Sequence, residues 1–63
     1  MDQIFATQKI SKYTDINCYE ITTTVVTKDD NHIYRTLLRS EPSNEVLDGI
    51  KSDCISDVLD LLD

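Results

Sequence analysis

Several residue types that often carry structure or chemistry are scarce in this 63-residue chain, which has no tryptophan, one histidine, one glycine, one proline and two cysteines. Two cysteines allow at most one disulfide, whereas a secreted scaffold of this length normally has four or more, so we expect free thiols in a reducing compartment. The single glycine and single proline argue against a linker or a disordered tail. These scarcities together predict a folded, cytoplasmic protein.

Motifs of catalysis and metal binding are also missing. The sequence contains no glycine-rich phosphate loop, no GxSxG elbow and no HExxH motif. The acidic run at 29–31 is expected to be a turn and not a calcium loop. Cys18, Cys54 and His32 lack the paired spacing of a zinc site, so structural burial of both thiols is expected. We therefore expect no enzyme activity, no cofactor and no metal.

Long apolar runs are absent as well. No stretch approaches the roughly 18 apolar residues of a membrane span, and the segment 1–10 does not have a secretion leader's pattern of a basic start and an apolar run. The composition, with 40% apolar and 29% charged residues, is that of a globular protein. One domain over 1–63 is expected, with a core so thin that chains of this size often rely on a disulfide, a metal or a second copy.

Two runs of β-branched and aromatic residues predict a hairpin. They are CYEITTTVVT at 18–27 and HIYRTLLR at 32–39, and the KDDN between them suits a tight turn because Asp and Asn bond to nearby backbone. A two-stranded hairpin is only marginally stable in water, so a further layer or strand is needed. The segment from Gln3 to Lys12 is expected to supply a third, edge strand, which makes 1–40 an antiparallel sheet.

The segment 41–63 predicts helix after the capping sequence Ser-Glu-Pro-Ser at 40–43. Steps of about 100° per residue give two apolar arcs, and on one straight helix these arcs miss each other by roughly 90°. A bend or break between Gly49 and Ser52 would align them. The expected fold is therefore α+β, a small antiparallel sheet packed by one kinked or two short C-terminal helices. The arcs are Val46, Leu47 and Ile50, and then Cys54, Ile55, Val58, Leu59, Leu61 and Leu62.

All of the net charge of −6 lies in this last segment, which holds seven acids and one base, while residues 1–40 hold five of each. Such a surface repels nucleic acid and attracts basic proteins. It can be a solubility face, or it can occupy a groove that binds phosphates. No direct contact with nucleic acid or membrane is expected. The candidate partner-binding acids are Glu41, Glu45, Asp48, Asp53, Asp57 and Asp60.

The stretch YEITTTVVTKDDNHIYRTLLRSEPSNEVLDG, from Tyr19 to Gly49, resembles the small uracil-DNA glycosylase inhibitors of Bacillus phages. These are short acidic proteins of a three-stranded sheet and two helices that act as dimers. The resemblance implies that Glu45 is a contact acid and that Val46 and Leu47 help to form helix packing or an apolar cleft. The chain departs from the pattern in having Asn44 and Asp48 where the family has aromatic residues near the glutamate.

Three functions are therefore predicted. The first is an acidic, phage-type inhibitor that mimics DNA and blocks a DNA-binding enzyme, with uracil-DNA glycosylase as the target. An anti-CRISPR or anti-restriction inhibitor seated in a basic nucleic-acid channel is an alternative with the same mechanism. The other alternative is a homodimeric interaction module without DNA mimicry, whose acids only keep it soluble. Candidate residues for an apolar cleft or dimer contact are Val46, Leu47, Ile50, Val58, Leu61 and Leu62.

Overall fold

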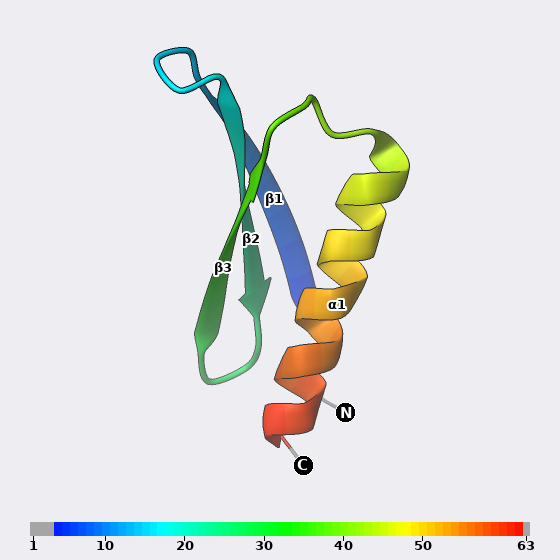
Figure 1. The fold of residues 1–63 in the computed structure, drawn as a ribbon. Coiled ribbons are helices and arrows are strands. Elements are labelled where there is room, and N and C mark those ends of the chain that lie inside the picture. The colour runs from blue at the N-terminus through cyan, green and yellow to red at the C-terminus, as the bar shows by residue number, and fades with distance from the viewer. Residues whose placement is uncertain (1–3, 63) are drawn as a thin grey trace.

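The computed structural model describes residues 4–62, and in it three antiparallel strands carry one helix (Figure 1). The strands are β1 (Phe5–Tyr13), β2 (Cys18–Val26) and β3 (Asn31–Leu38), in the spatial order β1-β2-β3, and the helix is α1 (Asn44–Leu62). The predicted α+β fold, with a hairpin and an N-terminal strand, is confirmed. Gln3, placed in that strand by the sequence, lies outside the described residues. No helix in the described part of the chain is long and apolar enough to cross a membrane.

The turn between β2 and β3 lies where the sequence predicts it, and the hydrogen bonds that close it are made by Thr27. The Thr27 backbone N–H donates to the Asp30 carbonyl oxygen at 2.8 Å, and the Thr27 hydroxyl donates to the same oxygen at 3.0 Å. The Thr27 Oγ1 atom also accepts the Asp30 backbone N–H at 3.1 Å. One threonine therefore satisfies both polar groups of the Asp30 backbone and fixes the register of the hairpin.

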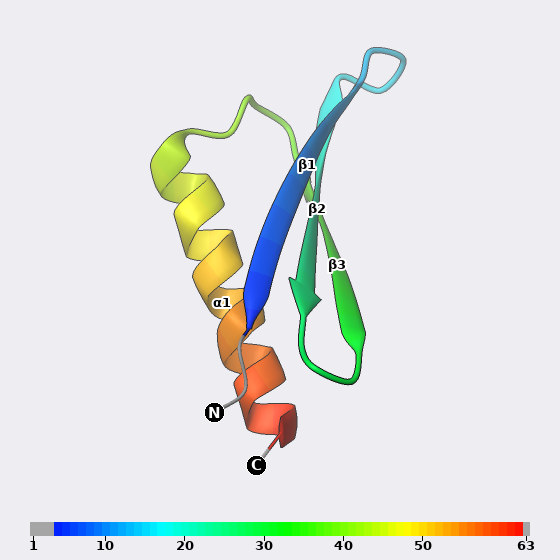
Figure 2. The same cartoon turned by 180° about the vertical axis from the view of Figure 1, so that it is seen from behind.

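The turn between β1 and β2 depends on an asparagine. Asn17 has φ 53°, in the left-handed region that asparagine tolerates better than most residues. This hairpin extends past the start of α1, and its tip carries the exposed Ile16 (Figures 1 and 2). Below the tip, the Tyr13 hydroxyl donates to a Glu20 carboxylate oxygen at 3.0 Å and bridges the two strands.

The core lies between β2 and one side of α1. Alternate residues of β2 (Ile21, Thr23 and Val25) are fully buried, and Val25 forms a cluster with Cys54 and Val58 of the helix. The buried Thr23 is satisfied because the Gln8 side-chain amide of β1 donates to its hydroxyl at 3.3 Å. The same amide donates to the Leu47 carbonyl oxygen at 2.9 Å and so ties the first turns of α1 to β1. The core is as thin as the length of the chain predicts.

The helix begins at a serine cap and then continues without interruption. The Ser43 hydroxyl oxygen accepts the Val46 backbone N–H at 3.3 Å, and the Ser43 carbonyl accepts the Leu47 N–H at 3.0 Å. Of the predicted bend or break between Gly49 and Ser52, the break is wrong, because α1 runs through both residues as one helix. A break would leave N–H and C=O groups of both new ends without helical partners. Because the helix stays continuous, the two apolar arcs cannot both face the sheet, and part of each is exposed. The exposed residues are Val46, Leu59, Leu61 and Leu62.

Replacing Gly49 by alanine tests the continuity of the helix. Gly49 has no positive φ, and a Cβ added there would meet no atom within 4 Å. Gly49→Ala should therefore stabilise the fold by roughly 0.5–1 kcal/mol, because alanine loses less backbone entropy in a helix. Thermal and urea denaturation measure the gain. Ser56→Ala, at another exposed helix position, should give a smaller gain, and a loss of stability in Gly49→Ala would show that the helix ends there.

Candidate functional site

The six candidate acids are all exposed, and five of them belong to α1. Buried Cys54 and Val58 mark the side of the helix that faces the sheet. At about 100° per residue, the five helix acids lie about 80° to 160° away from that direction. The single uninterrupted helix therefore turns all of them away from the core, over its outer surface. The five are Glu45, Asp48, Asp53, Asp57 and Asp60, while Glu41 lies in the connection between β3 and α1.

The sequence concentrates these acids in one segment and suggested one surface of a single sign, but in the structure they divide between the two sides of the helix. Asp57 lies on the side of β3, since its charge acts on Tyr34 of that strand. Nine residues separate Asp48 from Asp57, which puts Asp48 about half a turn away, on the side of β1. The side toward β3, called here the acidic flank, consists of Asp53, Asp57 and Asp60. Glu45 lies on the outer surface between the two sides.

The field of the acidic flank reaches the edge of the core. The pKa of Tyr34 is raised, first by burial and then by the charges of Asp57 and Cys54. Burial also raises the pKa of the Cys54 thiol, a hydrogen bond with Thr23 opposes this, and Asp57 and Asp53 raise it further. The raised pKa values keep the Tyr34 hydroxyl and the Cys54 thiol protonated and neutral beside the carboxylates. The acidic flank therefore lies next to Tyr34 and Cys54, which pack where the helix meets the sheet.

Two of the three bases of the sheet, Lys9 and Arg35, point to the opposite face of the molecule, whereas Lys12 lies on the helix-bearing face near the turn between β1 and β2. Lys9, Thr22 and Arg35 occupy one row across the three strands, and Thr22 alternates with the buried Ile21 and Thr23 that face the helix. The row therefore projects from the face without a helix, called here the open face. Because the sheet lies between them, these bases do not neutralise the acidic flank. Lys51, the only base of α1, is half-buried.

The open face also carries large apolar side chains, which sequence reasoning did not single out. Phe5, Ile33 and Leu37 are exposed on it, by 59%, 58% and 63% of their surface. The sequence did hold a signal for them: each of the three alternates along its strand with residues that face α1, which places it on the opposite face of the sheet. The expectation of a single helical layer did imply that one face of the sheet would stay uncovered.

The predicted cleft or dimer residues are divided by the structure. Val58 is fully buried, Ile50 packs against the core cluster and Leu47 is half-buried, so these three hold the fold together. The assignment of Val58 to a contact surface is therefore wrong, because this side chain exposes no area to a partner. Val46, Leu61 and Leu62 are exposed by 43%, 68% and 54%. Leu59, which the sequence placed on the buried arc, is also exposed.

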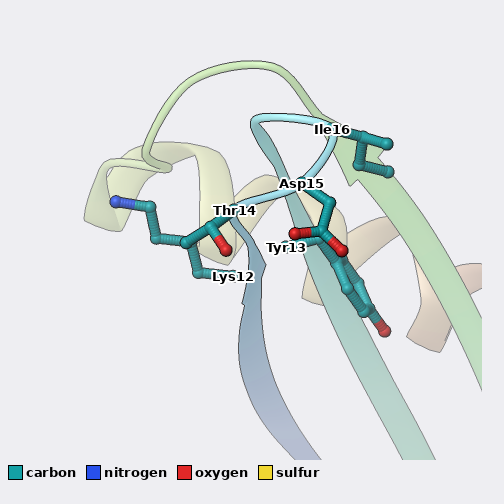
Figure 3. Close-up of a pocket in the computed structure, with 5 residues that line it drawn as sticks. All are labelled: Lys12, Tyr13, Thr14, Asp15 and Ile16. Atoms are coloured by element: carbon teal, nitrogen blue, oxygen red, sulfur yellow. The ribbon is translucent and has the colours of Figure 1, made fainter.

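A shallow hollow lies at the turn between β1 and β2 (Figure 3). It is lined by the consecutive residues from Lys12 to Ile16, and the Lys12 ammonium lies 5.6 Å from the centre of the Tyr19 ring. The Tyr13 hydroxyl is engaged by Glu20. Within residues 4–62, no three His, Cys, Asp or Glu side chains gather to hold a metal ion. The hollow thus offers a small mixed surface with one base and one acid.

Comparison of this chain with protein-family models, with curated proteins and with solved structures finds no match. What the protein does is therefore inferred from its own side chains. Two surfaces stand out for that purpose: the acidic flank of α1, and the exposed apolar residues on and beside the same helix.

The pKa of Tyr34 reports where the acids lie. A carboxylate near a tyrosine disfavours the phenolate and raises its pKa, so Asp57→Asn should lower the pKa of Tyr34. Asp48→Asn removes the same charge from the other side of the helix and should leave Tyr34 unchanged. NMR or ultraviolet titration of the tyrosines measures both. Equal effects of the two variants would show that the acids are not divided as described.

Proposed function

We propose that this protein is an acidic inhibitor, encoded by a phage and acting in the cytoplasm of its bacterial host, that blocks a DNA-binding enzyme by occupying its DNA site. The observation that supports this is the acidic flank, three exposed carboxylates on one side of α1, with Lys9 and Arg35 of the sheet on the far face. A surface of one sign attracts a cationic groove and directs the encounter.

The spacing of the carboxylates suits imitation of one DNA strand. At about 1.5 Å rise per residue, Asp53, Asp57 and Asp60 extend over about 10 Å, which is one charge per roughly 5 Å. A single strand of duplex DNA has one phosphate per about 3.4 Å. The flank is therefore less dense than a strand but comparable with it. We infer that it occupies the part of a basic groove that contacts one strand.

Uracil-DNA glycosylase is the proposed target because of the resemblance over Tyr19 to Gly49. In that comparison Glu45 is the contact acid, and here Glu45 is exposed in the first turn of α1 on the outer surface of the helix. It is thus accessible to a partner that also engages the acidic flank. A nuclease complex inhibited by an anti-CRISPR or anti-restriction protein is the alternative target for the same surface.

An interaction module without DNA mimicry is supported by a different observation, the exposure of Val46, Leu61 and Leu62 on the same helix. Val46 lies in the first turn of α1 and the two leucines in the last, so the helix exposes apolar side chains at both ends, where a partner could contact them. In that case the acids would serve solubility. Leu61→Asp would then abolish partner binding, while neutralising the acidic flank would change little.

The test is a glycosylase assay on uracil-containing DNA with and without the protein. We expect inhibition that weakens as salt rises, because exposed charges are screened over about 8 to 10 Å near physiological ionic strength. Replacing Asp53, Asp57 and Asp60 by asparagine should weaken inhibition by at least about tenfold, since three contacts at ~0.5 kcal/mol or more exceed the ~1.4 kcal/mol of a tenfold change.

A matched control removes three acids elsewhere. Asp15, Asp29 and Asp30 are exposed in the two turns, and their replacement by asparagine changes the net charge equally. The Thr27 and Asp30 bonds of the turn use only backbone atoms of Asp30, so this control retains them. Inhibition unaffected by loss of the acidic flank would contradict mimicry. Retention of a nuclease and no glycosylase from bacterial lysate would favour the alternative target.

A further inference from the structure

We propose that the outer edge of β3 accepts an extended segment of another protein as a fourth strand. Within residues 4–62 this strand has one neighbour, β2, so the backbone N–H and C=O groups on its other side pair with no strand. β3 has eight residues and contains neither proline nor glycine. An edge of this kind pairs readily with an added strand, which is how several peptide-binding domains hold their ligands. Such pairing uses backbone atoms and does not depend on DNA mimicry.

The two edges of the sheet differ in how well they resist an added strand. β1 carries two lysines, Lys9 and Lys12, and lysine on an edge strand is a common guard against pairing. β3 has no lysine and one arginine, Arg35, which lies between Ile33 and Leu37. These two apolar side chains are exposed by 58% and 63% on the open face. The edge of β3 is therefore the less protected one.

The position of α1 leaves room for a strand beyond β3. The helix packs mainly on β2 and less on β1, and near its turn with β2 the strand β3 is the one farthest from the helix in both views (Figures 1 and 2). A helix with its side chains is about 10–12 Å wide, so above β2 it extends about 5–6 Å to each side. Strands lie about 4.8 Å apart, which puts a fourth strand roughly 10 Å from β2 and outside the helix.

On the open face, an added strand would meet three side chains of β3. Ile33, Arg35 and Leu37 alternate with the half-buried residues of the strand that face α1. Apolar pairs and pairs of opposite charge on neighbouring strands stabilise a sheet. The matching segment therefore has an apolar residue, an acid and an apolar residue at alternate positions.

The acidic flank sets the chemistry of the other face of the added strand. Residues there point to the α1 side, next to Tyr34, on which the charge of Asp57 acts. Lysine or arginine at these positions would be attracted to the acidic flank. In antiparallel pairing of two copies through β3, the two acidic flanks would instead approach each other and repel. The occupant that fits is therefore a segment of a different protein, with bases alternating with the apolar and acidic residues.

A synthetic peptide of this pattern tests the site. The peptide Thr-Val-Lys-Glu-Lys-Val-Thr puts its valines and glutamate on one face and its lysines on the other. In an NMR titration of the isotope-labelled protein, we expect the peptide to shift the amide signals of β3 and to leave those of β1 in place. The same peptide with proline instead of glutamate cannot complete the ladder and should cause no shift. Unshifted β3 signals, shifts confined to β1, or equal shifts with the proline peptide would overturn the proposal.

Two matched variants test the edge from the side of the protein. Ile33 and Phe5 are exposed by 58% and 59% on the open face, one on each edge of the sheet. Ile33→Lys should abolish the shifts caused by the peptide, because lysine guards the edge and repels the bases of the peptide, whereas Phe5→Lys should retain them. Circular dichroism checks that both variants are folded, and Leu37→Lys replaces Ile33→Lys if the latter is not. Equal shifts in the two variants would contradict the assignment to β3.

The mass in solution separates this site from an interface between copies. If light scattering gave twice the 7.2 kDa of the chain and Ile33→Lys restored the mass of one chain, the edge of β3 would belong to a second copy and the proposal would be wrong. We expect the mass to be the same for the wild type and Ile33→Lys. Because these experiments contain a peptide and no enzyme, their failure is distinct from failure of the glycosylase assay.

Discussion

The contact of Cys54 and Val58 with Val25 is the interaction on which the rest of the structure depends. These two helix residues are one turn apart, so together they fix the rotation of α1 about its own axis as well as its position on the sheet. That rotation decides where every other helix side chain points. It sends the carboxylates outward, divides them between two sides and leaves three leucines in solvent.

Local signals in the sequence were sufficient for the hairpin of β2 and β3. Residues 18–27 and 32–39 are rich in β-branched and aromatic side chains, and the intervening Asp residues have few alternatives to a turn, so the strands and their turn were predicted. The third strand required only the physical argument that a hairpin alone is marginal. Its residues, from Phe5 to Tyr13, were placed to within two positions at each end. Ser43 was likewise recognisable as a cap because its hydroxyl precedes the apolar pattern.

The helix shows where such reasoning stops. A helical wheel assumes that every apolar residue is buried, and on that assumption the two arcs required a bend or break between Gly49 and Ser52. The sheet offers α1 only the strip occupied by Ile21, Thr23 and Val25, so one line of helix residues suffices to cover it. Leu59 and Leu62 lie off that line, and no local property of the sequence shows this. The same limit explains why Val58 was assigned to a contact surface and Leu59 to the core.

The central strand has a consequence for how this protein opens. β2 is hydrogen-bonded on both sides, whereas β1 and β3 each have one neighbouring strand within residues 4–62. Amides of β2 can therefore exchange with solvent only when a flanking strand detaches, while about half of the amides in β1 and β3 point away from the sheet. The slowest-exchanging amides should therefore be those of β2, while β1 and β3 open locally on either side of it.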